Sequence, residues 1–192
     1  MIPLKTGREN PPVQFETLLI EPINLFVQSK PWNDSLPHIQ LELSVAENNK
    51  KYSTFLCYYG TDDEPRINYP KAFENYIFSL EINTDSINLI VEKLDFGKDF
   101  FIDFGQKAVI ENITVSFEKT VRELIADIIT GCKTGDFINY YILLSDENEQ
   151  KKFSFESLYR YGENKLTLEW KEYQIFVLYD SEKFLKLKVI EN

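Results

Sequence analysis

Apolar and polar residues alternate along several segments of this chain, as they do in β-strands that bury one face. The clearest segment has apolar residues at every second position, namely Ile39, Leu41, Leu43 and Val45. A period of two places the apolar set on one face of a sheet and leaves the polar set in water. The polar stretch Ala46–Lys51 predicts a turn. The pattern of strand, turn and second strand over His38–Phe55 therefore predicts a β-hairpin.

The hairpin pattern occurs twice in the sequence. Leu43-Ser44 matches Leu144-Ser145 at a distance of 101 positions, and Lys50-Lys51 matches Lys151-Lys152 at the same distance. Two further matches keep the same order along the chain at distances of 98 and 90, namely Ile77-Phe78 with Ile175-Phe176 and Ile20-Glu21 with Ile110-Glu111. Chance resemblance between hairpins would give isolated matches, whereas ordered matches favour a duplicated unit.

These patterns predict an all-β protein of two tandem, internally repeated antiparallel modules, each a β-sandwich or barrel-like. We place the first module at residues 15–97 and the second at residues 98–192. Residues 1–14 are predicted to be an irregular arm, because Pro3, Gly7, Pro11 and Pro12 oppose regular strand pairing. Further strands are expected at Leu18–Gln28, Tyr76–Asn83 and Ser86–Lys93.

One segment departs from the strand pattern. Between about residues 120 and 130, apolar residues recur at helical spacing, namely Val121, Leu124, Ile125, Ile128 and Ile129. Thr120 and Glu123 have the spacing of a capping box, and Gly131 follows as a stop signal. The sequence therefore predicts one short helix at about 120–130, and at most that one.

The chain is acidic, with 31 Asp and Glu against 21 Lys and Arg and a net charge of −10 over 192 residues. A negative field opposes binding to a phosphate backbone, so no nucleic-acid partner is expected. It favours a basic partner, although an acidic surface also serves solubility alone. No apolar stretch has the length of a signal peptide or of a membrane span, so we expect a cytoplasmic protein with no membrane contact.

Residues for catalysis or metal binding are scarce. His38 is the only histidine, and Cys57 and Cys132 are the only cysteines and are expected to be free thiols. The two cysteines lack the spacing of a zinc site, and a Ser–His–Asp arrangement would have to use His38. The triplets Asp95-Phe96-Gly97 and Asp103-Phe104-Gly105 lack the other motifs of a kinase and are interpreted as a core aromatic followed by a turn glycine. We predict no catalytic residue, no metal and no cofactor.

The remaining functional signal is aromatic residues beside acidic loops. Trp32 lies in a Pro-bracketed polar loop, and Tyr58 and Tyr59 precede Asp62, Asp63 and Glu64. Rigid aromatics next to carboxylates suit an interface with a basic protein, although Trp32 would also suit a lid over a hydrophobic edge. These six residues form the predicted partner-binding site.

We therefore expect a non-enzymatic, acidic interaction module that docks a basic protein surface, as an inhibitor, an immunity-type protein or an assembly component. Two alternatives stay open. One is a carbohydrate- or cation-binding β-sandwich that uses Trp32, the tyrosines and the loop carboxylates. The other is a hydrolase that uses a pair of carboxylates. Edge strands would also allow a homodimer.

Overall fold

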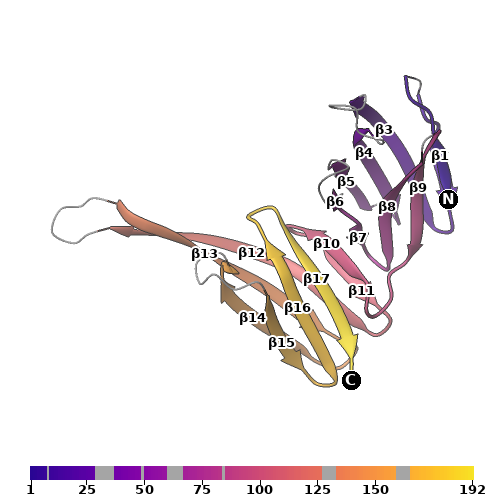
Figure 1. The fold of residues 1–192 in the computed structure, drawn as a ribbon. Helices are drawn as coiled ribbons and strands as arrows, with labels where there is room; N and C mark the ends of the chain where they lie inside the picture. Colours follow the sequence, from indigo (N-terminus) through magenta and orange to yellow (C-terminus); the bar gives the residue numbers. More distant parts are fainter. Residues whose placement is uncertain are drawn as a thin grey trace. The chain divides into compact units, whose positions relative to one another are not determined.

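The computed structural model describes residues 1–7, 9–28, 37–48, 50–59, 67–83, 85–126, 133–158 and 165–192. It confirms the all-β prediction, because the regular elements of this part of the chain are strands (Figure 1). The chain divides into two compact units. Unit 1 comprises Met1–Lys71 and Ile77–Glu92, and unit 2 comprises Ala72–Tyr76 and Lys93–Asn192. The predicted module bounds, residues 15–97 and 98–192, stay a prediction.

Unit 1 is built from two antiparallel sheets. One sheet has the strand order β2-β3-β4-β5-β6, and the other begins with the order β1-β9-β8 and continues with β7, of which Ala72 and Phe73 belong to unit 2. The strands are β1 (Ile2–Leu4), β2 (Val13–Phe15), β3 (Leu18–Gln28), β4 (His38–Glu47), β5 (Lys50–Tyr59), β6 (Ile67–Asn68), β7 (Lys71–Phe73), β8 (Tyr76–Asn83) and β9 (Ser86–Lys93). The alternating residues Ile39, Leu41, Leu43 and Val45 are all fully buried, as their spacing predicts.

Unit 2 has the same design. One sheet has the order β11-β12-β13-β14, and the other contains β10-β17-β16-β15. The strands are β10 (Asp99–Asp103), β11 (Lys107–Ile110), β12 (Ile113–Ala126), β13 (Lys133–Ser145), β14 (Gln150–Glu156), β15 (Leu166–Trp170), β16 (Tyr173–Asp180) and β17 (Phe184–Glu191). The open sheet orders of both units favour the sandwich-like alternative over the barrel.

The two units repeat each other in irregularities as well as in strand order. A β-bulge interrupts β3 between Pro22 and Asn24, and β12 has one between Phe117 and Lys119. Three backbone positions with positive φ also recur, namely Gly7 and Gly105 (67° and 77°), Glu16 and Glu111 (50° and 51°), and Glu74 and Lys171 (50° and 54°). A positive φ is costly for a residue with a Cβ. Its recurrence at matching turns confirms the internal repeat.

The register corrects how the two copies align. When the two bulges are superposed, Leu43 corresponds to Ile142, because the pair Pro22–Leu43 matches the pair Phe117–Ile142. The distance between the copies is therefore 99 positions in this hairpin, and the 101 read from the sequence was wrong. A slip of two residues keeps every side chain on the same face, so the apolar pattern does not reveal it.

The alignment of Ile20-Glu21 with Ile110-Glu111 was also wrong. Ile110 and Glu111 lie at the β11–β12 turn, whereas Ile20 lies inside β3 and is equivalent to Val115. The match at distance 98 between Ile77-Phe78 and Ile175-Phe176 is displaced by one residue as well. When the turns at Glu74 and Lys171 are aligned, Tyr76 is equivalent to Tyr173. Phe78 is then equivalent to Ile175.

The helix predicted at about 120–130 is wrong over residues 120–126, and residues 127–130 lie outside the described part. β12 continues to Ala126 and pairs with β13 as far as Ala126–Lys133. β14 pairs with β13 only as far as Asn139–Glu156, so the β12–β13 ribbon extends past it (Figure 1). Helical spacing of apolar residues is a local signal, and here pairing with a distant strand overrides it.

The arm predicted at residues 1–14 is not wholly irregular. β1 pairs with β9 through Ile2–Leu89 and Leu4–Ile87, and β2 begins at Val13. Pro3 is tolerated because β1 is an edge strand, where a missing N–H breaks no ladder hydrogen bond on the open side.

Candidate functional site

The structure separates the two tyrosines of the predicted site. Tyr58 and Tyr59 are neighbours in β5 and therefore lie on opposite faces of the sheet. Tyr58 is opposite the fully buried Ile39, whereas the ring of Tyr59 is exposed and packs edge-on against His38 at 5.7 Å. Burial, together with a hydrogen bond to Cys57, raises the pKa of Tyr59 to about 12. Trp32, Asp62, Asp63 and Glu64 lie outside the described residues, so their role stays a prediction.

Tyr59 belongs to a larger exposed face that the sequence analysis missed. Eight large hydrophobic residues are exposed in the described part of the chain, and five of them lie on the outer face of β3, β4 and β5. These five are Leu19 (46% exposed), Ile23 (44%), Phe26 (63%), Phe55 (49%) and Tyr59 (36%). Isolated exposed hydrophobics are normal, but a group on one flat sheet face is typical of a binding surface. We call these five residues the apolar face.

Strand register explains why these side chains share a face. Asn24 of β3 pairs with Glu42 of β4, which pairs in turn with Phe55 of β5. Residues paired across antiparallel strands point to the same side, so the three form one row across the sheet. The bulge at Ile23 adds an unpaired residue to β3, which exposes a second apolar side chain next to this row.

Two carboxylates lie within the apolar face. The Nδ2 of Asn24 donates to the Oε2 of Glu42 at 2.6 Å, which fixes the Glu42 carboxylate beside Phe55. Glu21, one row further along β3, is 3.9 Å from the ammonium of Lys51. That pair is long and exposed, so it neutralises Glu21 only weakly. The surface therefore combines exposed rings with negative charge.

Unit 2 has an equivalent face of different chemistry. At the positions of Leu19, Ile23 and Phe55 it carries Thr114, Glu118 and Ser154. The Glu118 carboxylate pairs with Lys152 at 3.3 Å. The ammonium of Lys119 lies 5.6 Å from the centre of the Tyr141 ring and covers it. The repeat thus folds with polar residues at these three positions, so folding does not explain Leu19, Ile23 and Phe55. At the positions of Phe26 and Tyr59 unit 2 keeps the apolar residues Val121 and Leu158.

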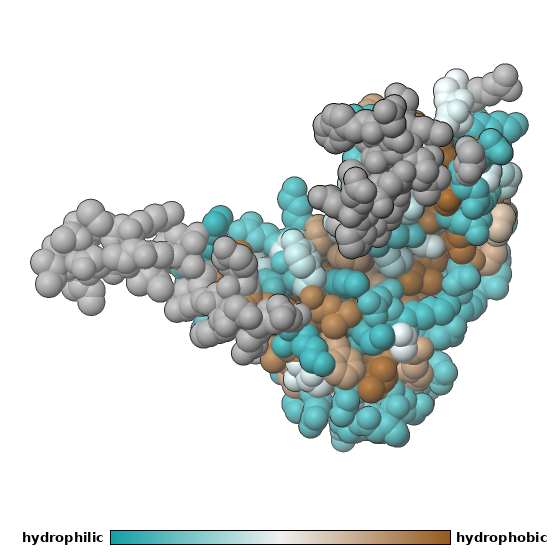
Figure 2. Space-filling model, in the orientation of Figure 1, coloured by the Kyte–Doolittle hydropathy of each residue, from teal (hydrophilic) through white to brown (hydrophobic). Residues whose placement is uncertain are grey.

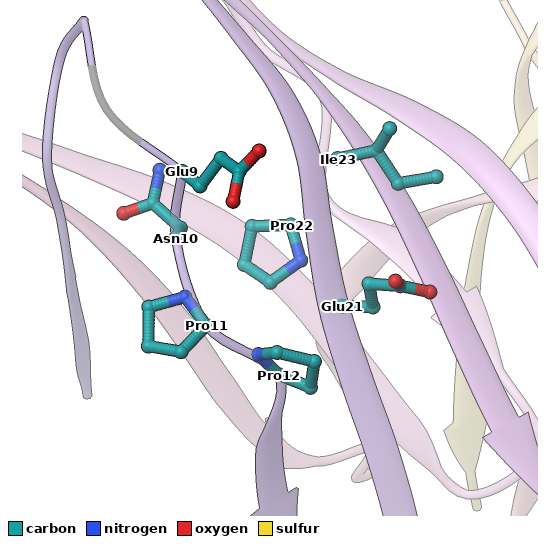
Figure 3. A pocket seen from close by; sticks show the side chains of 7 residues that line it. All are labelled: Glu9, Asn10, Pro11, Pro12, Glu21, Pro22 and Ile23. Atoms are coloured by element: carbon teal, nitrogen blue, oxygen red, sulfur yellow. The ribbon is translucent and has the colours of Figure 1, made fainter.

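Unit 1 also contains an open pocket of about 550 Å³ at the edge of the same sheet. Its lining residues come from the β1–β2 connection and from β3, namely Glu9, Asn10, Pro11, Pro12, Glu21, Pro22 and Ile23 (Figure 3). The Pro22 ring and the Glu9 carboxylate lie in the space between the two segments (Figure 3). The pocket offers carboxylates and proline rings, which suit a cationic group and supply no nucleophile.

The other sequence features find structural roles. Gly97 and Gly105 occupy turns with φ of 80° and 77°, as the turn interpretation of the two triplets predicts. Phe104 is 52% exposed, so its assignment as a core aromatic was wrong, and Phe96 stacks on Tyr173 at 5.8 Å. Among the described residues, no group of three or more His, Cys, Asp and Glu is placed to hold a metal ion.

No protein-family model matches this chain, and no curated protein matches it either. Within the described ranges, no helix has the length and apolarity needed to cross a membrane. The visible surface mixes hydrophobic and hydrophilic residues (Figure 2). A function for this chain is therefore inferred from the chemistry of its surface, above all from the apolar face.

Proposed function

We propose that this chain is a non-enzymatic interaction module that docks a basic protein on the apolar face of unit 1. The observation that carries the proposal is the difference between the repeats. Unit 2 has polar side chains where unit 1 exposes Ile23 and Phe55, so these side chains serve something other than folding. Binding a partner is what an exposed apolar sheet face commonly does.

The partner's chemistry follows from the charges on this face. Glu21 and Glu42 lie among the exposed rings, and the chain as a whole has a net charge of −10. A partner with Lys or Arg around apolar side chains would satisfy both components, and the long-range attraction would speed its association. As an inhibitor, immunity-type or assembly protein, the chain would need only this surface and no reaction centre.

The test uses capture at low salt followed by measurement with purified components. The wild-type protein, immobilised on beads, is expected to retain one or more basic proteins from a lysate of the source cells. Each retained protein is then purified and titrated against the double variant Ile23→Glu/Phe55→Ser, which carries the residues of unit 2. Loss of two interface anchors is expected to weaken binding by at least about 30-fold, the equivalent of about 2 kcal/mol.

The matched control is Tyr179→Ser, which removes an aromatic that is 53% exposed in unit 2. It should leave affinity unchanged, and Glu42→Gln should reduce the salt dependence of binding. Equal binding by the double variant and the wild type would refute the proposal, and so would the absence of any basic partner at low salt.

A further inference from the structure

Unit 2 includes a short segment from earlier in the chain, Ala72–Tyr76. Its strand β7 is the hydrogen-bonded neighbour of β10, and its turn contacts the edge of β11. The Glu74 N–H donates to the Lys107 carbonyl at 3.1 Å, and the Val109 N–H donates to the Glu74 carbonyl at 2.8 Å. The Glu74 carboxylate also pairs with the Lys107 ammonium at 2.9 Å. The β10–β11 edge is thus a docking site for a strand followed by a turn.

The second repeat has its own copy of that docking segment. β15 and its turn are equivalent to β7 and its turn, with Trp170 in the place of Phe73 and Lys171 in the place of Glu74. Both turns hold this residue at positive φ, 50° for Glu74 and 54° for Lys171. β15 is the last strand of its sheet. Its outer edge is therefore open within the described residues.

The first repeat has its own copy of the docking site. β1 and β2 are equivalent to β10 and β11, and both are edge strands among the described residues. Pro12 and Gln14 are equivalent to Lys107 and Val109. The Pro12 carbonyl and the Gln14 N–H are therefore the counterparts of the two groups that bond to Glu74 in unit 2. Pro3 replaces Phe101 and lacks an N–H, so the site on unit 1 offers one donor fewer.

Charge complementarity matches the copied segment to this site. In unit 2 the turn is acidic and the strand is basic, through Glu74 and Lys107. In the copies the signs are reversed, because the turn carries Lys171 and the pocket beside Pro12 carries Glu9 and Glu21. The pocket of about 550 Å³ is large enough to admit a lysine side chain. Lys171 already pairs with Asp146 and Glu149 of its own copy, so on docking it would share or exchange these carboxylates with Glu9 and Glu21 of the second copy.

We infer that the chain associates head to tail, with β15 and the Lys171 turn of one copy on the β1–β2 edge of a second copy. The contact is heterologous, so it builds rings if the rotation closes and filaments if it does not. The missing donor at Pro3 makes it weaker than the contact within unit 2, and association is therefore expected at micromolar or higher concentration. This contact overlaps the proposed docking surface at Glu21 and Ile23, which line the pocket, so the two are separated experimentally at Phe55, which does not line it.

Disulfide trapping tests this contact directly. The residue paired with Glu74 in unit 2 is Ala108, and the corresponding pair between two copies is Lys171 and Val13. Two single variants, Val13→Cys and Lys171→Cys, are prepared with Cys57 and Cys132 changed to Ser. Because Lys171→Cys removes the lysine charge, the cross-link tests the strand register of the contact and not the charge pairing. Mixed and mildly oxidised, they should give a disulfide-linked heterodimer, because bridge partners lie within the Cα spacing that a disulfide needs. A single chain carrying Glu74→Cys and Ala108→Cys is the positive control.

A mixture of Lys171→Cys with Ser154→Cys, an exposed position on β14 of unit 2, measures random collision. Phe55→Ser in the Val13→Cys chain should leave the cross-link unchanged, which separates this contact from partner docking. The wild-type protein should show an average mass in sedimentation that rises with concentration. The inference is overturned if the heterodimer is no more abundant than the random control while the positive control closes.

Discussion

The outer faces of two equivalent sheets show how one fold carries two surfaces. On β3, β4 and β5 of unit 1, Ile23 and Phe55 are 44% and 49% exposed. At the same positions on β12, β13 and β14, unit 2 has Glu118 in an ion pair and Ser154. The backbones share the order of four strands, the bulge and three turn positions with positive φ. The difference between the faces is therefore a property of side chains alone.

The comparison also teaches what the fold requires. The inner faces are apolar in both units, with Leu43 and Ile142 fully buried at equivalent positions. Burying such residues provides the main driving force for folding, so both repeats keep them. The outer faces contribute little to that driving force and were free to diverge. The proposed docking function would account for the apolar outer face of unit 1.

The largest effect is expected on the inner faces. Leu43→Ala and Ile142→Ala should each lower the free energy of unfolding by about 2–5 kcal/mol, because each leaves a cavity in a core. Denaturant titration measures both, with Ser53→Ala on the exposed face of β5 as the control. A cost below about 1 kcal/mol for either variant would show that the inner faces of the two units are not equivalent.

An intermediate effect on stability is expected at the ion pair between Asp146 and Lys171, which has no counterpart at the equivalent positions of unit 1. The Lys171 ammonium contacts the Asp146 carboxylate at 2.5 Å, and the N–H groups of Asn148 and Glu149 donate to it at 2.8 Å. These contacts, the Lys171 hydrogen bond first, lower the pKa of Asp146 to about 2. A lowered pKa in the folded state stabilises it above the ordinary value of 3.8, and the stabilisation is lost as pH falls toward 2.

Asp146→Asn should therefore lower Tm at pH 6, and the gap from the wild type should close as pH falls from 4 to 2. Unit 1 has Glu47 and Glu74 at the equivalent positions, two acids that form no such pair with each other. Glu147→Gln, exposed at the same hairpin tip, is the control. A gap that stays constant across this pH range would assign the effect of Asp146→Asn to packing and not to charge.

The smallest effect on stability is expected from exchanging the outer faces. Ile23→Glu/Phe55→Ser in unit 1 and Glu118→Ile/Ser154→Phe in unit 2 should each change the free energy of unfolding by no more than about 0.5–1 kcal/mol. Binding of a hydrophobic dye should decrease in the first double variant and increase in the second. A large loss of stability in the first would mean that the apolar face supports the fold of unit 1, and would weaken the proposed docking function.

The sequence predicted much of the fold because alternation is a local property. The strands Leu18–Gln28, Tyr76–Asn83 and Ser86–Lys93 have the predicted bounds, and the first hairpin begins at His38 as expected. The predicted site at Trp32 and the acidic loop stays a prediction, and the apolar face was not predicted. The aromatic and acidic signals at Trp32, Tyr59 and Asp62 come from short stretches of chain, whereas the apolar face is assembled from three strands.

The sequence does not show on which face of a sheet some apolar side chains lie. In Leu18-Leu19-Ile20 all three side chains are apolar, and only pairing with β4 shows that Leu19 is the exposed one. The sequence after the hairpin turn does not distinguish Phe55 from a core aromatic. Phe55 pairs with Glu42, and this pairing places its ring on the exposed face. An apolar residue has the same composition on either face, so its direction depends on which strand it pairs with.

By itself the sequence determined that the chain is all-β, repeated and acidic, because periodicity and charge require no knowledge of distant contacts. The tertiary structure decided the alignment of the repeats, the strand conformation of residues 120–126 and the collection of exposed rings on one face. Each of these depends on hydrogen bonds between strands far apart in the chain, and a period of two is unchanged when strands slip by two residues.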